Sequence, residues 1–262
     1  MQPDRRTFLS LLAAGAAATV LAPVSRAAAA RRPAFKAVAF DAFPVFDPRP
    51  VFALAEKLFP GRGAELSNAW RTRQFEYQWL RALSGQYADF LKTTDDALVF
   101  ATNMLKLELT PDKRKSLMQA YLELKAWPDV PAALGTLKQQ GLKLAFLSNM
   151  TAAMLETGIK TAGLPGIFDR VLSTDQIKTY KPDPRAYQLA IDAFGLEKRE
   201  ILFVAFAGWD AAGAKAFGYP TFWVNRLNLP REELGVVPDA TGATLTDLVR
   251  FVTGAHDKAE QN

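Results

Sequence analysis

Apolar and polar positions follow two different periods along the chain. Short, mainly apolar runs occur at 34–40, 142–147, 171–173, 201–205 and 221–224. They predict buried strands, the last of them at 221–224. Apolar residues recur at helical spacing in four further segments, at 131–140, 151–162, 184–194 and 210–217. Strands that alternate with helices of this length predict an α/β fold, a Rossmann-like doubly wound parallel sheet with helices on both faces.

The stretch 48–127 interrupts this alternation, because it contains helical spacing alone. Helices are predicted from Ala53, over 65–83, from Ala97 with Thr94 as the N-terminal cap, and from Pro111 with Thr110 as the cap. One face of the second helix carries Leu66, Trp70, Phe75, Trp79, Leu80 and Leu83. We expect its aromatic residues to pack in the core rather than to contact a substrate.

These patterns together predict the division of the chain. The core is expected to consist of residues 30–47 and 128–252, and an all-helical cap is expected to be inserted at 48–127. A polar tail is expected at 253–262.

The first 29 residues have the pattern of an export signal. Arg5 and Arg6 precede an Ala- and Leu-rich run, 11–24, which leads to small residues at 27–29. Paired arginines before such a run are typical of twin-arginine export. The alternative, a membrane helix, would need roughly 20 strongly apolar residues. We expect a twin-arginine signal peptide at 1–29, a periplasmic mature protein, and no membrane contact after the signal is removed.

The composition limits the chemistry that a site can use. The sequence has no cysteine and a single histidine, His256, in the polar tail. A disulfide framework, a thiolate zinc site and a multi-histidine metal centre are therefore excluded, so carboxylates and cations would carry any catalysis. The net charge is +5, but lysines and arginines are dispersed among acidic residues. Nucleic-acid binding needs clustered cations and is not expected, whereas small anionic substrates are favoured.

Charged and polar residues stand where four predicted strands end. Asp41 follows the first strand, Ser148 and Asn149 follow the second, Lys181 lies in the loop after the third, and Trp209 and Asp210 follow the fourth. Ligands of open parallel sheets bind at the carboxyl ends of the strands. Each residue alone could be a helix cap or part of a turn, but together they predict an active site.

These positions resemble the motifs of the haloacid dehalogenase superfamily, namely Phe40-Asp41, Leu147-Ser148-Asn149, Tyr180-Lys181-Pro182-Asp183-Pro184 and Gly208-Trp209-Asp210. Most members that act on phosphate carry a second aspartate two residues after the first, and here that position is Phe43. The chain is similar to the type II (S)-2-haloacid dehalogenases, which lack that aspartate and use no metal. Cap residues 70–81 and 87–90 are similar to theirs as well.

The resemblance implies hydrolysis of a small (S)-2-haloalkanoate to an (R)-2-hydroxy acid. Asp41 would attack carbon 2, expel halide and form an ester that water hydrolyses. Arg71 would meet the leaving halide, and Lys181 would keep Asp41 ionised. Asp210 would position or activate the water.

The resemblance also implies a substrate-binding set and a mode of assembly. Ser148 and Asn149 would hold the substrate carboxylate. Tyr187 would orient the lysine region and Trp209 would belong to an apolar wall, and both are placed with the substrate-binding residues. No metal and no cofactor are expected, and members of this family often form homodimers through the cap.

Several positions depart from the family pattern, always from polar to apolar. Where the family has Asp-x-Tyr-Gly-Thr, this chain has Phe43, Pro44 and Val45, and a serine and an asparagine before the fourth motif are replaced by Ala205 and Ala207. Each lost polar contact could cost roughly 2–4 kcal/mol of transition-state stabilisation. Two interpretations stay open: a working dehalogenase, or a weakened or retuned hydrolase that is phosphatase-like or binds carboxylates.

Overall fold

A six-stranded parallel sheet forms the centre of the protein. The computed structural model describes residues 35–254. The predicted signal peptide at 1–29 and residues 255–262 of the predicted tail, including His256, lie outside this range. The strands run in the order β5-β4-β1-β6-β7-β8. Their bounds are β1 Ala37–Phe40, β4 Lys143–Ser148, β5 Arg170–Ser173, β6 Ile201–Ala205, β7 Thr221–Val224 and β8 Ala240–Gly242.

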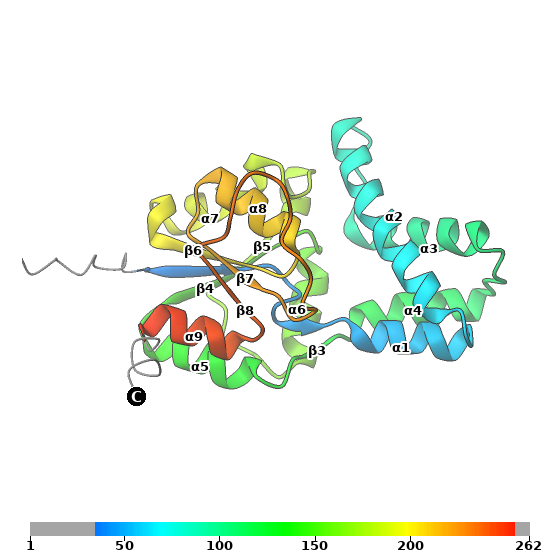
Figure 1. Cartoon of the computed structure of the whole chain (residues 1–262), viewed down its shortest axis with the longest axis horizontal. Helices are drawn as coiled ribbons and strands as arrows, with labels where there is room; N and C mark the ends of the chain where they lie inside the picture. The colour runs from blue at the N-terminus through cyan, green and yellow to red at the C-terminus, as the bar shows by residue number, and fades with distance from the viewer. Residues whose placement is uncertain (1–34, 255–262) are drawn as a thin grey trace, which may run out of the picture. The chain divides into compact units, whose positions relative to one another are not determined.

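Helices cover both faces of this sheet (Figure 1). Side chains alternate along a strand, so Val38 and Phe40 of β1 join one core and Ala37 and Ala39 join the other. The first core also holds side chains of α5 Val130–Gln139, α6 Ala152–Thr161 and α9 Leu245–Thr253. The second holds those of α7 Pro184–Phe194 and α8 Gly208–Phe217. The prediction of a doubly wound parallel sheet is confirmed.

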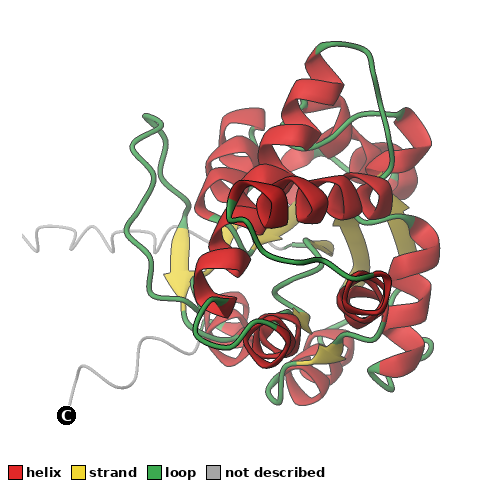
Figure 2. Cartoon of the chain, turned by 90° about the vertical axis from the view of Figure 1, so that its right-hand side faces the viewer, coloured by secondary structure: helices red, strands yellow, loops and turns green. Residues whose placement is uncertain are grey.

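Four helices lie between β1 and the rest of the sheet in the sequence. They are α1 Arg49–Leu58, α2 Gly63–Leu83, α3 Phe90–Met104 and α4 Pro111–Leu122. The two connections to the core pair as a small antiparallel sheet of β2 Phe46–Asp47 and β3 Lys125–Ala126. Figure 2, in which the right-hand side of Figure 1 faces the viewer, shows the cap helices in front of the strands. Two 3-10 helices, η1 Thr174–Ile177 and η2 Lys198–Glu200, complete the core.

Several local predictions were wrong. Helix α3 begins at Phe90 rather than Ala97, because Asp89 accepts the main-chain N–H of Lys92 at 2.8 Å and caps the helix about two turns earlier. The strand at 221–224 is not the last, since β8 and α9 follow it. Leu80 and Leu83 do not pack inward: they are 57% and 87% exposed.

The connections between cap and core are tied to the loop that follows β1. Two residues, Trp127 and Arg226, donate hydrogen bonds to four successive carbonyls, at 43–46. Trp127 Nε1 donates to the first and last at 3.0 and 3.1 Å, its main-chain N–H donates to the third at 3.1 Å, and Arg226 Nη2 donates to the second at 2.9 Å. Arg226 in turn forms a bidentate ion pair with Asp129. The main chain beside Asp41 is thereby held in one conformation.

Within residues 35–254, no helix has both the length and the apolar character needed to cross a bilayer.

Candidate active site

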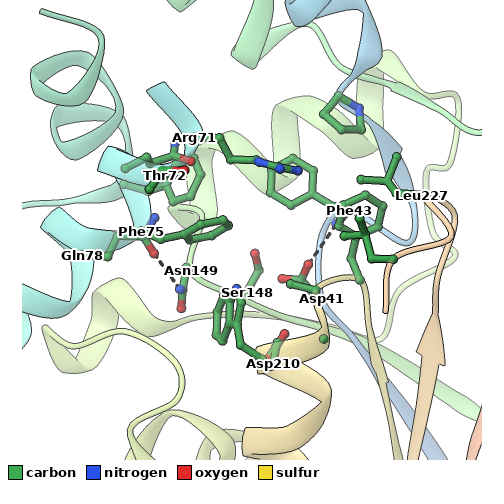
Figure 3. Close-up of a pocket in the computed structure, with 18 of the residues that line it drawn as sticks. Asp41, Phe43, Arg71, Thr72, Phe75, Gln78, Ser148, Asn149, Asp210 and Leu227 are labelled. Atoms are coloured by element: carbon green, nitrogen blue, oxygen red, sulfur yellow. Dashed lines mark hydrogen bonds between the residues drawn. The ribbon is translucent and has the colours of Figure 1, made fainter. Parts of the chain in front are cut away.

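A cavity of about 380 Å³ lies at the carboxyl ends of β1, β4 and β6, and residues of the cap line its other side. Six of the eight residues singled out from the sequence line it: Asp41, Arg71, Ser148, Asn149, Trp209 and Asp210. Lys181 and Tyr187 are not part of the lining and lie just beneath it. Figure 3 shows Asp41, Ser148 and Asp210 close together at the floor of the cavity.

Lys181 joins the two carboxylates of the site. Its Nζ donates to Asp41 Oδ1 at 2.9 Å and to Asp210 Oδ2 at 2.5 Å. All three side chains are buried, and Lys181 is 1% exposed. Buried charges are stable only when they are paired and hydrogen-bonded, and the ammonium here compensates two anions at once. Among residues 35–254, Asp41 Oδ2 accepts only the main-chain N–H of Phe43, at 3.3 Å, and no cation contacts this oxygen.

The electrostatics of this trio differ from those of free side chains. Burial by itself lowers the pKa of the Lys181 ammonium, but the carboxylates of Asp210 and Asp41 outweigh it and raise the pKa above its usual value. Lys181 is therefore charged at neutral pH. Burial, helped by the charge of Asp41, raises the pKa of Asp210 to about 6 against the opposing effect of Lys181. Asp210 is thus poised to exchange a proton near neutrality.

Tyr187 supports Asp210 from the side away from the cavity. Its hydroxyl donates to Asp210 Oδ1 at 2.8 Å, and burial, reinforced by the negative charge of Asp210, raises the pKa of that hydroxyl well above its usual value. It is fully buried. The placement of Tyr187 among substrate-binding residues does not fit this position: it would act on a substrate only through Asp210.

Asn149 is held by a chain of amides that the sequence did not reveal. The main-chain N–H of Lys181 donates to Asn149 Oδ1 at 2.9 Å, so the other end of that amide, Nδ2, faces Gln78 and donates to its Oε1 at 2.8 Å. Gln78 then presents Nε2, a fully buried donor without a hydrogen-bond partner among residues 35–254. The signal was available: Arg71, Gln74 and Gln78 are polar residues at helical spacing that form a stripe on α2.

Two groups in the cavity are ready to bind an anion. Ser148 Oγ accepts the main-chain N–H of Met150 at 3.2 Å, which leaves its proton free to be donated. Arg71 is half-buried across the cavity from Asp41 in Figure 3, and within the part of the chain that the structure describes it forms no ion pair or hydrogen bond. An unpaired guanidinium in a largely apolar cavity favours a negatively charged ligand.

Aromatic side chains form one wall of the cavity. The rings of Phe75 and Trp79 stack at 5.9 Å between centroids, and both contact Trp209 edge-on at 5.4 and 5.5 Å. The expectation that Phe75 and Trp79 pack in the core was therefore wrong, whereas Trp70 is fully buried as expected. Trp70, Phe75 and Trp79 all stand on α2, and their position relative to the core decides which of them line the cavity.

The polar-to-apolar departures affect the cavity less than the sequence suggests. Phe43 and Ala207 line it. Val45 and Ala205 are buried in the two hydrophobic cores and do not line it, and the carbonyl of Pro44 is used by Arg226. Only two of the five replacements thus change the surface that a substrate would meet.

A site of this kind can do nucleophilic chemistry on an anionic substrate. It combines a carboxylate that faces the cavity, a buried cation beneath it, a second carboxylate with a raised pKa and a guanidinium opposite. A family model of haloacid dehalogenase-like hydrolases matches residues 8–218. The chain belongs to this family. Its fold is the one that the resemblance implied.

Members of this family that resemble the chain over most of its length are known. It is 43% identical over 227 residues to the (S)-2-haloacid dehalogenase of Pseudomonas sp. strain YL, covering 86% of this chain and 98% of that protein. A solved L-2-haloacid dehalogenase matches with a TM-score of 0.82 and 45% identity, covering 84% and 99%. The L-2-haloacid dehalogenase of Xanthobacter autotrophicus with covalently bound chloropropionic acid matches with a TM-score of 0.77 and 36% identity, again covering 84% and 99%.

Proposed function

We propose that this protein hydrolyses (S)-2-haloacids to (R)-2-hydroxy acids through an ester on Asp41. The observation that carries the proposal is the position of Asp41: one carboxylate oxygen is held by Lys181 at 2.9 Å, and the residue lines a cavity that also contains Arg71. The similarity to (S)-2-haloacid dehalogenases over most of both chains supports it. The alternative of a weakened or phosphatase-like hydrolase is not favoured.

The first step is a displacement at carbon 2. Asp41 Oδ2, the oxygen without a cation, forms the new C–O bond, and the carbon–halogen bond breaks with its electron pair on the halide. Attack from the opposite side inverts the carbon. Arg71 is suited to receive the halide, because a guanidinium is always charged and weakly hydrated. Ser148 and the amide of Asn149 are suited to hold the substrate carboxylate.

The second step is hydrolysis of the ester. Water adds to the carbonyl carbon of the Asp41 side chain, and Asp210 accepts the proton. With a pKa of about 6, Asp210 is ionised above that pH and can act as the base. The bond between Cγ and Oδ2 of Asp41 then breaks, and the leaving alkoxide takes up the proton from Asp210. The hydroxyl oxygen of the product therefore comes from Asp41, the new carboxylate oxygen of Asp41 comes from water, and the second proton of that water is released to solvent.

The reaction is proposed to need no divalent metal. The Lys181 ammonium pairs with both carboxylates of the site, at 2.9 Å from Asp41 and 2.5 Å from Asp210. Lys181 already supplies the positive charge that a hard metal ion would bring. Phe43, at the position of the second aspartate of phosphate-processing relatives, adds no ligand oxygen.

Two measurements test the proposal. Halide release from (S)-2-chloropropionate is expected to be unaffected by EDTA or added Mg²⁺, and Asp41→Asn is expected to abolish it. In a single turnover with excess enzyme in heavy-oxygen water, the label is expected in the Asp41 side chain. Release of phosphate from a phosphomonoester only with Mg²⁺, or an unlabelled Asp41 after turnover, would contradict the proposed chemistry.

We further propose that the protein is exported to the periplasm by the twin-arginine signal at 1–29. The proposal depends on Arg5, Arg6 and the apolar run that follows them. Replacing both arginines by lysine is expected to keep the full-length chain in the cytoplasm, as fractionation would show. Pairing through the cap is likewise a proposal, testable by the mass of the purified protein in solution.

A further inference from the structure

The cavity is larger than a short haloacid needs. (S)-2-Chloropropionate has six non-hydrogen atoms, and even at ~30 Å³ each, the share of liquid volume of a water molecule, it would fill about 180 Å³. The cavity measures about 380 Å³. About half of it would stay empty around such a substrate, and empty apolar space adds nothing to affinity.

The surplus space has an identifiable lining. On the side of Asp41 away from Phe75 and Gln78 in Figure 3 lie Phe43 and Leu227. With Phe52, Phe206 and Leu229 they form what we name the outer subsite. None of these five side chains carries a charge or a hydrogen-bonding group, whereas Arg49, Asn225 and Glu232 are polar residues that also line the cavity. Apolar surface that faces a cavity next to a reacting group favours an apolar part of the substrate.

The outer subsite begins at the reacting group and leads outward. Phe43 is two residues from Asp41 and its main-chain N–H contacts Asp41 Oδ2 at 3.3 Å. Its ring packs against that of Phe206 with 5.9 Å between centroids and 49° between planes. Exposure rises from 8% at Asp41 to 40% at Leu227 and 47% at Leu229. A substituent on carbon 2 would therefore pass the two rings and reach the mouth of the cavity.

We propose that the outer subsite binds an aryl group on the substrate, so that the protein acts on 2-halo-3-arylpropanoates in preference to short haloalkanoates. The inference rests on the proposed function and names its substrate class. The tilted pair of Phe43 and Phe206 offers both ring faces and ring edges, which is the contact that an aromatic substituent favours. A 12-atom acid such as 2-chloro-3-phenylpropanoate needs at most about 360 Å³ by the same count, which the cavity provides.

Two apparently harmful departures contribute to this subsite. At position 43, where the family has tyrosine, phenylalanine presents an apolar ring with no hydroxyl to be desolvated. Ala207, where the family has asparagine, lines the cavity with a small side chain beside Phe206. The two replacements thus exchange polar contacts for apolar space on the side where the aryl group would lie.

The test compares two substrates in wild type and in variants that fill the outer subsite. Leu227→Trp is the main variant and Leu229→Trp the second; both positions are exposed enough to accept a larger ring without disturbing the core. Leu234→Trp is the matched control, since Leu234 is 59% exposed on the same loop and does not line the cavity. The kcat/KM of halide release is measured with (S)-2-chloro-3-phenylpropanoate and with (S)-2-chloropropionate.

The wild-type kcat/KM is expected to be at least tenfold higher for the aryl substrate. Leu227→Trp or Leu229→Trp is expected to lower it at least tenfold for that substrate and less than twofold for chloropropionate, and Leu234→Trp is expected to change neither. Turnover of chloropropionate without comparable turnover of the aryl substrate, or an equal loss for both in the filling variants, would overturn the subsite.

A binding measurement separates this inference from the proposed function. Calorimetry with the unreactive acids 3-phenylpropanoate and propanoate needs no chemistry. The subsite predicts at least tenfold tighter binding of the phenyl acid, and loss of that preference in Leu227→Trp. If neither haloacid releases halide but this preference holds, the proposed function fails and the subsite stands. Equal binding of the two acids refutes the subsite whatever the enzyme does with haloacids.

Discussion

The hydrogen bond from Tyr187 lowers the pKa of Asp210, so we predict that its loss shifts the pH at which the ester is hydrolysed. In Tyr187→Phe the ring and its packing against Phe203 and Phe217 stay, while the donor at 2.8 Å from Asp210 Oδ1 is lost. A hydrogen bond to a charged group contributes about 1.5–3 kcal/mol. Since 1.36 kcal/mol corresponds to one pKa unit, the pKa of Asp210 should rise by about one to two units.

The direction of the effect follows from the role of Asp210. The base must be ionised, so the rate of ester hydrolysis falls as pH drops through its pKa. That pKa is about 6 in the wild type, and in Tyr187→Phe the acid limb is expected between about pH 7 and 8. At pH 6.5 the variant should therefore release one equivalent of halide rapidly and the hydroxy acid slowly, because the ester accumulates on Asp41.

The assay follows halide and hydroxy acid separately over pH 5 to 9 with (S)-2-chloropropionate. Tyr219→Phe is the matched control: it also loses a buried hydroxyl, but that hydroxyl donates to the main-chain oxygen of Tyr187 at 2.6 Å and not to Asp210. Its acid limb is expected at the wild-type position. An unshifted limb in Tyr187→Phe, with no halide burst at pH 6.5, would refute the assignment of Asp210 as the base of the second step.

Three further substitutions probe the supports of the site. Lys181→Met leaves two buried carboxylates without their cation; we expect a stability loss of about 3–5 kcal/mol and an acid limb shifted upward, seen by thermal melting and pH profile. Gln78→Met removes the acceptor of Asn149 Nδ2 and should raise KM about five- to twelvefold with little change in kcat, as a bond of about 1–1.5 kcal/mol implies; an unchanged KM would count against the amide chain. Arg226→Lys keeps the charge but loses the bidentate pair with Asp129 and the hydrogen bond to the Pro44 carbonyl. We expect it to lower the melting temperature by a few degrees and to slow halide release. A wild-type rate of halide release would show that the loop after β1 keeps its conformation without Arg226.

Local patterns determined much of the fold. The helix caps at Thr110 and Thr151 and the left-handed Gly195 that ends α7 lie where helical spacing starts and stops, because capping depends on neighbours within one turn. Asp89 shows the limit of this reasoning. It and Thr94 both suit a cap, and only the packing of Phe90 into the core selects the earlier start. Strand β8 was missed since a three-residue edge strand carries almost no periodic signal.

The sequence by itself placed Asp41, Ser148, Asn149 and Asp210 at one edge of the sheet, because parallel strands bring their carboxyl ends together whatever else the chain does. Tertiary structure alone decided what these side chains do there. Lys181 is 140 residues from Asp41 and 29 from Asp210, yet its Nζ contacts both. Likewise Gln78 meets Asn149 across 71 residues, and Phe75 and Trp79 face the cavity although their spacing equals that of a buried stripe. Helical and strand periods report which side of an element is apolar, but the partner of that side depends on how separate elements pack.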